Sequence, residues 1–105
     1  MMGTLNHDAY KYITSQNVAV ATSGGASAQS SAFGAQTLWV RLAFSSSTTG
    51  SGVRYTFAAN PTATSTSPLL PANWVEVVKV NPGQKLAALS NDASAQSLSV
   101  SELTD

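Results

Sequence analysis

The amino-acid sequence predicts an all-β protein, a single antiparallel β-sandwich or jelly-roll-like barrel with an extended N-terminal arm. Short segments in which apolar and polar residues alternate recur along the chain, and this alternation is the period of a strand. Clusters of Gly, Pro, Asn and Ser separate the segments, as turns do. Amphipathic helical periodicity is hard to find. Many short strands without intervening helices favour a sandwich or a barrel.

Seven strands are expected after the arm. They are residues 17–22, 28–33, 37–44, 53–58, 74–80, 85–90 and 97–103. The strongest of them, TLWVRLAF, alternates over its whole length. The tetrapeptide NPGQ predicts a type II turn, because Pro82 presets φ at the first central position and Gly83 tolerates a positive φ at the second.

Alternation also predicts which side chains form the core, because one face of each strand turns inward. The expected core residues are Leu38, Val40, Leu42, Phe44, Tyr55, Phe57, Val75, Val77, Leu86, Leu98 and Val100. Trp39 alternates with its apolar neighbours, so we expect it on the opposite face, exposed or at an interface.

The 105 residues fit one domain, which we divide into an arm, residues 1–16, and a β-sandwich, residues 17–105. Two tyrosines and an isoleucine of the arm lie outside the strand pattern and need a surface to pack on. Such arms usually pack on their own domain or on a neighbouring subunit. The candidate interface residues are therefore Tyr10, Tyr12, Ile13 and Trp39.

Charged residues make up only 10% of the chain, with five basic, five acidic and a net charge of zero. So low a charge gives little protection against self-association and suggests that partners cover part of the surface. The basic residues are scattered, so they do not offer the clustered phosphate contacts of a nucleic-acid-binding protein. The absence of cysteine excludes a disulfide framework and thiolate metal sites. We expect neither a signal peptide nor a membrane span.

We expect no enzymatic activity, metal or cofactor. His7 is the only histidine and lies on the expected arm, where a Ser-His-Asp arrangement would not be held rigidly. One histidine without cysteine makes a poor metal site. Glu76 has Lys79 and Lys85 as expected ion-pair partners, so a catalytic carboxylate pair with Glu102 is not favoured.

The stretch FAANPTATSTSPLLPANWVE, residues 57–76, has strand-like ends and a middle rich in Thr, Ser and Pro. Its hydroxyls have no base beside them in the sequence, which makes them weak nucleophiles. We expect them instead to bond to the backbone of a long connection that the prolines stiffen. The stretch is therefore predicted to be a rigid crossover between two sheets or sheet edges.

The two tryptophans leave a binding function open. Trp39 and Trp74 could stack on sugars, as in a carbohydrate-binding module. Packing in the core or at an interface is the alternative, and large amphipathic rings suit both settings. We expect Trp74, which opens a strand after LLPAN, to close one end of the core.

Several motifs occur together in a recognisable pattern. AQ tracts precede an aromatic strand in NVAVATSGGASAQSSAFGAQTLWVRLAFSS, ANPTAT and LLPA lie within VRYTFAANPTATSTSPLLPANWVEVVKVNPGQKLAAL, and SLSVSEL ends the pattern. In these features residues 17–103 resemble a group of small structural proteins of tailed bacteriophages. The resemblance implies a virion component, and it implies no catalytic or cofactor residue.

The expected function is therefore that of a bacteriophage head decoration (cement) protein, which binds and stabilises the capsid lattice. The expected partners are the major capsid protein or other virion proteins and further copies of the chain in a homo-oligomer, with no nucleic acid and no membrane. The expected location is the virion, assembled in the host cytoplasm. A tail, neck or fibre-base component, or a glycan-binding module on a phage fibre, is the alternative.

Overall fold

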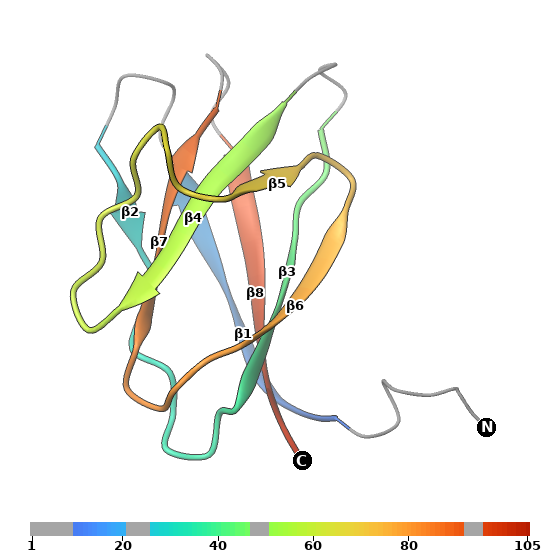
Figure 1. Cartoon of the computed structure of the whole chain (residues 1–105). Helices are drawn as coiled ribbons and strands as arrows, with labels where there is room; N and C mark the ends of the chain where they lie inside the picture. Colours follow the sequence, from blue (N-terminus) through green and yellow to red (C-terminus); the bar gives the residue numbers. More distant parts are fainter. Residues whose placement is uncertain (1–9, 21–25, 47–50, 92–95) are drawn as a thin grey trace.

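Within residues 10–20, 26–46, 51–91 and 96–105, which the computed structural model describes, eight strands form two antiparallel sheets (Figure 1). Sheet A has the order β1 (Lys11–Val20), β8 (Gln96–Thr104), β3 (Trp39–Ala43), β6 (Val75–Lys79). Sheet B has the order β2 (Ala28–Gln29), β7 (Lys85–Ser90), β4 (Gly52–Ala58), β5 (Leu69–Pro71). The two sheets pack around one core, so the predicted all-β antiparallel sandwich is confirmed.

The strand pairing is that of a jelly roll. β1 pairs with β8, β2 with β7, β3 with β6 and β4 with β5, all antiparallel, so the chain resembles one long hairpin rolled up. Two further pairings, β3 with β8 and β4 with β7, join these pairs into the two sheets. Eight strands nested in this way in two packed sheets are the jelly-roll architecture, the barrel-like form of the predicted fold.

β1 begins earlier than the sequence pattern indicates. It pairs with β8 along its length, with an irregularity between Tyr12 and Thr14. The predicted boundary between arm and sandwich, after residue 16, falls inside this strand. The first half of β1 is exposed and lacks an inward alternation, so pairing with the backbone of β8 rather than burial makes it a strand. Residues 1–9, which include His7, lie outside the described residues.

Most of the predicted core residues lie between the inner faces of the two sheets. The buried ones are Val40, Leu42, Phe44, Tyr55, Leu86, Leu98 and Val100. Phe57 is partly buried and packs against this cluster. The prediction that Val75 and Val77 belong to the core is wrong, because both side chains are exposed.

The register of β6 explains this error. Glu76 and Val78 pair with Leu42 and Val40, which are fully buried, so Glu76 and Val78 lie on the core side of β6. Val78 is half-buried there, whereas Glu76 is still exposed at the sheet edge. The segment VEVVKV carries apolar residues at both odd and even positions, so alternation alone does not select which face of the strand turns inward. The inward Glu76 carboxylate accepts a hydrogen bond from the Tyr55 hydroxyl of the opposite sheet. This bond stabilises the observed register.

β5 is a strand that the sequence analysis does not predict. Pro68 precedes it and Pro71 is its last residue. Proline argues against a strand except at a sheet edge, which is where β5 lies. Gly52 of β4 lies close to this strand. A Cβ at this position would lie 2.5 Å from Cδ1 of Leu69 and 3.2 Å from the Leu70 carbonyl oxygen, so a larger residue would require the exposed Leu69 side chain to shift.

The type II turn predicted at NPGQ is confirmed. Gly83 has a φ of 84°, and the Gln84 N–H donates to the Asn81 carbonyl at 3.2 Å. The turn joins β6 of sheet A to β7 of sheet B. It therefore carries the chain from one layer of the sandwich to the other.

Candidate interaction surface

The outer side of sheet B is covered by the chain itself. Residues 59–68, the 59–68 connection, run from the end of β4 to the start of β5 over this side of the sheet (Figure 1). Nε2 of Gln29 in β2 donates to the Pro61 carbonyl at 2.8 Å. Nη1 of Arg54 in β4 donates to the Ser67 carbonyl at 3.0 Å. The connection is thus tied to strands on both sides of β7.

Burial of small residues shows the effect of this cover. Ala87 of β7 lies between Leu86 and Ala88, which face the core, so its side chain faces outward. It is nevertheless fully buried. Ala63 of the connection is also buried, and its N–H donates to the Ser27 hydroxyl at 2.9 Å. The outer face of sheet B is therefore closed at its centre.

The hydroxyls of the connection bond to its own backbone, as predicted. The Thr64 N–H donates to Oγ of Ser67 at 3.0 Å, and the Ser67 N–H donates to the Thr64 carbonyl at 3.0 Å. The Thr66 N–H donates to Oγ1 of Thr64 at 3.4 Å. The 59–68 connection joins neighbouring strands and covers sheet B. The predicted crossover lies further along the stretch, where residues 72–74 lead from β5 at the edge of sheet B to β6 at the edge of sheet A.

Sheet A exposes its outer face. The outward side chains are exposed or half-buried, and across β6, β3 and β8 they form the rows Val75–Ala43–Ser99 and Val77–Arg41–Ser101. Most of these side chains are small, and Arg41 is the long exception. Small side chains on a sheet leave a flat surface. A flat surface of this kind can be approached closely by another protein.

Exposed apolar side chains also concentrate on sheet A. In the described part of the chain, the large ones are Tyr12, Ile13, Leu69, Trp74, Val75 and Val77. Only Leu69 belongs to sheet B. Trp74, Val75 and Val77 are 64%, 50% and 42% exposed and follow one another along the β6 edge. We name these three residues the β6 patch. Contiguous exposed apolar groups mark interaction sites more often than single ones.

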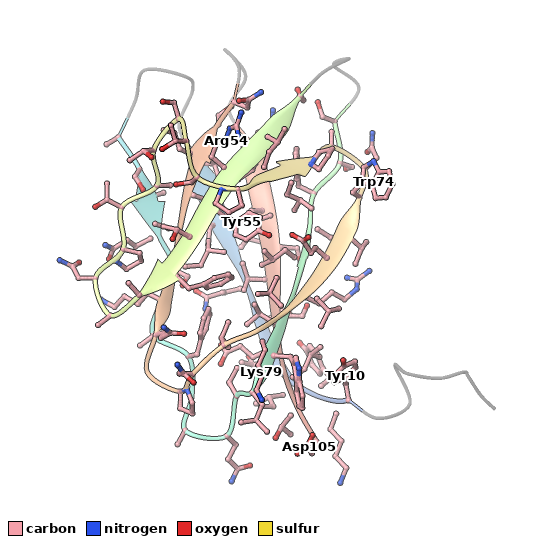
Figure 2. All side chains as sticks on the ribbon, in the orientation of Figure 1. Tyr10, Arg54, Tyr55, Trp74, Lys79 and Asp105 are labelled. Atoms are coloured by element: carbon pink, nitrogen blue, oxygen red, sulfur yellow. The ribbon has the colours of Figure 1, made fainter. Side chains whose placement is uncertain are left out.

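A hollow of about 480 Å³ lies beside the β6 patch. It is lined by Ala43, Phe44, Ser45, Asn73, Trp74, Val75, Ser97 and Ser99. Figure 2 shows Trp74 at the outer margin of the molecule, with its ring pointing away from the sandwich. The expectation that Trp74 closes one end of the core is therefore wrong.

Asn73 explains why Trp74 is presented outward. Its φ of 66° turns the chain sharply just before β6, a conformation that Asn tolerates better than most residues. Its N–H donates to the Phe44 carbonyl at 3.0 Å, and its side-chain Nδ2 donates to the Ser46 carbonyl at 3.0 Å. These bonds fix the start of β6 against the end of β3. The turn at Asn73 thereby directs the Trp74 indole ring outward.

The four residues predicted as an interface fall into two groups. Tyr10 and Trp39 pack edge to face with ring centroids 4.9 Å apart, and both are half-buried at one end of sheet A. Tyr12 and Ile13 lie in β1 and are exposed. Trp39 therefore packs mainly against its own chain. The interface role of Tyr12 and Ile13 stays a prediction.

Sequence reasoning missed the β6 patch. Trp74, Val75 and Val77 were all assigned to the core, because they are apolar and lie in or beside a strand. Charge gives no signal that could place them. Glu76 and Lys79 lie on opposite faces of the segment, so either choice of inner face carries one charge.

The expected ion pair of Glu76 with a lysine is replaced by its bond to Tyr55. Glu76 faces inward and Lys79 outward, so the two side chains lie on opposite faces of β6. Burial, followed by the hydrogen bond to the Glu76 carboxylate and the charge of that group, raises the pKa of Tyr55 well above its ordinary value. The Tyr55 phenol therefore stays protonated and ties β4 to β6 across the sandwich.

Glu102 is a buried carboxylate with a structural role. Its Oε1 accepts hydrogen bonds from Oγ1 of Thr37 at 2.7 Å and from the Gly34 N–H at 2.9 Å. These donors lie just before β3 and fix the segment that leads into it. A charge bonded in this way holds the local backbone, since burying it without partners would be costly.

The side-chain hydrogen bonds of Glu76 and Glu102 hold parts of the fold together. Among them no three His, Cys, Asp or Glu residues gather as metal ligands would. The described part of the chain also contains no helix long and apolar enough to cross a membrane. The surface with the clearest potential for function is thus the outer face of sheet A with the β6 patch.

Comparisons with protein-family models, with curated proteins and with solved structures found no match to the chain.

Proposed function

We propose that this protein is a structural subunit of a bacteriophage virion, a head decoration protein that binds and stabilises the capsid lattice. The observation that carries the proposal is the asymmetry of the sandwich. Sheet B covers itself with the 59–68 connection, whereas sheet A exposes a flat face and the β6 patch. A face of this kind suits binding to another protein surface.

Fold and composition support the same proposal. Jelly rolls are a common architecture of viral capsid proteins and of lectin domains, and this part of the argument is an analogy of fold. The chain carries few charges, so contacts built from its backbone, hydroxyl and apolar groups lose little affinity when salt rises. A subunit that binds only the intact lattice stabilises it by mass action, by about 2.7 kcal/mol per site at a hundredfold excess over the Kd.

The test compares virions assembled with and without the protein during heating and during dilution of external salt. Virions with the protein are expected to retain DNA to a higher temperature. The triple variant of the β6 patch, Trp74→Ser, Val75→Ser and Val77→Ser, is expected to remove this protection. Leu69→Ser on sheet B serves as the matched control and is expected to preserve it. Release of DNA at one temperature by all four kinds of virion contradicts the decoration role.

Glycan binding is the second candidate, and the hollow beside Trp74 favours it. The exposed indole stands next to the hydroxyls of Ser45, Ser97 and Ser99, and no hydrogen bond links these hydroxyls to other described residues. A ring for stacking and hydroxyl groups that line one hollow suit a saccharide. Titration with oligosaccharides is expected to quench tryptophan fluorescence in the Trp39→Phe variant and not in Trp74→Phe. Equal responses of the two variants contradict this candidate.

A further inference from the structure

Three of the four edges of the described sheets carry features that hinder pairing with another strand. β5 is three residues long, follows Pro68 and ends at Pro71. β2 is two residues long, and its Gln29 side chain is bonded to the 59–68 connection. β1 is covered midway by its Gln16 side chain, whose Oε1 accepts from the Ser31 N–H at 2.9 Å. Short strands, prolines and covering segments are common devices that prevent pairing between edges.

β6 lacks these devices. It has five regular residues without proline or bulge, and it pairs with β3 alone in the described part of the chain. Its inward charge, Glu76, is already bonded to Tyr55, and its single lysine, Lys79, stands at the very end of the strand. The outward side chains Val75 and Val77 are apolar and exposed. An open edge that carries apolar groups is a template for another strand.

The backbone of β6 determines which groups are free. The Val80 N–H donates to the Leu38 carbonyl at 2.9 Å, so this residue turns its backbone groups toward β3. Backbone groups alternate in direction along an antiparallel strand. The N–H and C=O groups of Val75, Val77 and Lys79 therefore point away from β3, toward the open edge.

We propose that two copies of the chain pair antiparallel through β6, about a two-fold axis that passes beside Val77, and so join their A sheets into one continuous sheet. In this register Val77 lies opposite its twin and Val75 lies opposite Lys79 of the other copy. All three outward residues of each strand then donate and accept a hydrogen bond. A shift by two residues in either direction leaves one of the three without a partner strand, so this register satisfies the most backbone groups.

The side chains suit this register. The two Val77 side chains meet on the outer face, and Val75 packs along the aliphatic stem of Lys79 of the other copy. The two Lys79 residues lie four positions apart, which is about 13 Å along a strand and beyond the Debye length of about 10 Å at 0.1 M salt. The two Lys79 side chains are therefore not opposed. The two Glu76 side chains, each hydrogen-bonded to Tyr55 of its own copy, are diagonal neighbours about 7–8 Å apart on the other face. A chain of zero net charge adds no long-range repulsion. The pairing is self-complementary, which is why the second copy is the occupant we infer.

This inference goes beyond the virion role and does not rest on it, because β6 pairing needs only the isolated chain. Joining two A sheets leaves their outer faces free and doubles the flat surface. A protein that dimerises in solution but does not protect virions would support β6 pairing and contradict the virion role. A monomer that protects virions would support the virion role and contradict β6 pairing.

Sedimentation equilibrium of the full chain over a range of concentrations tests the pairing. The protein is expected to form a reversible dimer. Val77→Lys and Val77→Glu each place like charges opposite each other at the axis, so each is expected to weaken association on the order of tenfold or more. An equimolar mixture of the two variants is expected to restore the dimer. Leu69→Lys on the β5 edge is the matched control and is expected to dimerise like the parent protein.

A second variant tests the register. The chain contains no cysteine, so Val77→Cys introduces a single thiol. Opposed residues of a hydrogen-bonded pair have Cα atoms about 5.5 Å apart, which a disulfide can span. Mild oxidation is expected to trap a covalent dimer of Val77→Cys and not of Leu69→Cys. A parent protein that stays monomeric, a charge-swapped mixture that stays monomeric, or equal cross-linking at both positions would overturn the proposal.

Discussion

Sheet A and sheet B have the same number of strands and share one core, yet their outer sides differ. Sheet B is closed by the 59–68 connection over its face and by short or covered strands at its edges. Sheet A keeps a flat face of small residues and one open edge with the β6 patch. The difference teaches that the chain protects one layer of the sandwich and leaves the other available. Binding is expected on the unprotected layer.

The largest expected effect contrasts the inner and outer faces of sheet A. Leu42→Ala removes a fully buried side chain and is expected to lower the free energy of unfolding by about 2–5 kcal/mol. Val77→Ala on the adjoining strand changes an exposed side chain and is expected to change it by less than about 0.5 kcal/mol. Chemical denaturation of the dilute protein measures both. Similar losses for the two variants would show that the outer face is not free.

The cover of sheet B can be loosened at Gln29. Its side chain donates to Oδ1 of Asn60 at 3.0 Å and to the Pro61 carbonyl at 2.8 Å. Gln29→Ala is expected to cost about 1–2 kcal/mol, because two hydrogen bonds are lost, and to speed exchange of the amide hydrogens near Ala63. Gln36→Ala changes an exposed glutamine and is the control. An unchanged exchange rate near Ala63 after Gln29→Ala would contradict the closed state of this face.

The bond between Tyr55 and Glu76 links the open edge of sheet A to sheet B. Tyr55→Phe is expected to cost about 1 kcal/mol. Folding raises the pKa of Tyr55, so the folded protein holds the phenol proton more tightly than the unfolded chain does. In the unfolded chain the pKa of tyrosine is about 10. The stability from this bond is present below that pH and is lost as pH rises above it. Denaturation at successive alkaline pH values should therefore show a smaller decline for Tyr55→Phe, and an equal decline would refute the assignment.

The smallest expected effect on stability is that of Trp74→Ala. The indole is mostly exposed and lies outside the core, so the free energy of unfolding is expected to change by less than about 0.5 kcal/mol. Phe44→Ala, at the buried side of the same hollow, is expected to cost about 3–5 kcal/mol. A large loss for Trp74→Ala in the dilute protein would assign the ring to the fold instead of the surface.

Much of the fold follows from the sequence. Strict alternation around Leu42 and Leu98 identifies core strands, and the positive φ of Gly83 follows from the turn residues around it. β5 escapes prediction because its prolines are tolerated only at an edge, which a sequence does not reveal. The β6 patch escapes because the strand is apolar at both parities. The inner face of β6 depends on a hydrogen bond between Tyr55 and Glu76, two residues that lie far apart in the sequence.

Amide hydrogen exchange along β6, followed residue by residue at increasing protein concentration, tests the central claim most directly. In the dilute protein, the N–H groups of Glu76 and Val78 are expected to be protected by β3, and those of Val75 and Val77 are expected to exchange rapidly. Raising the concentration is expected to protect Val75 and Val77, while the N–H of Leu69, which points to the free edge of β5, stays unchanged. Rates at Val75 and Val77 that do not depend on concentration, or new protection along β5 instead, would contradict the account.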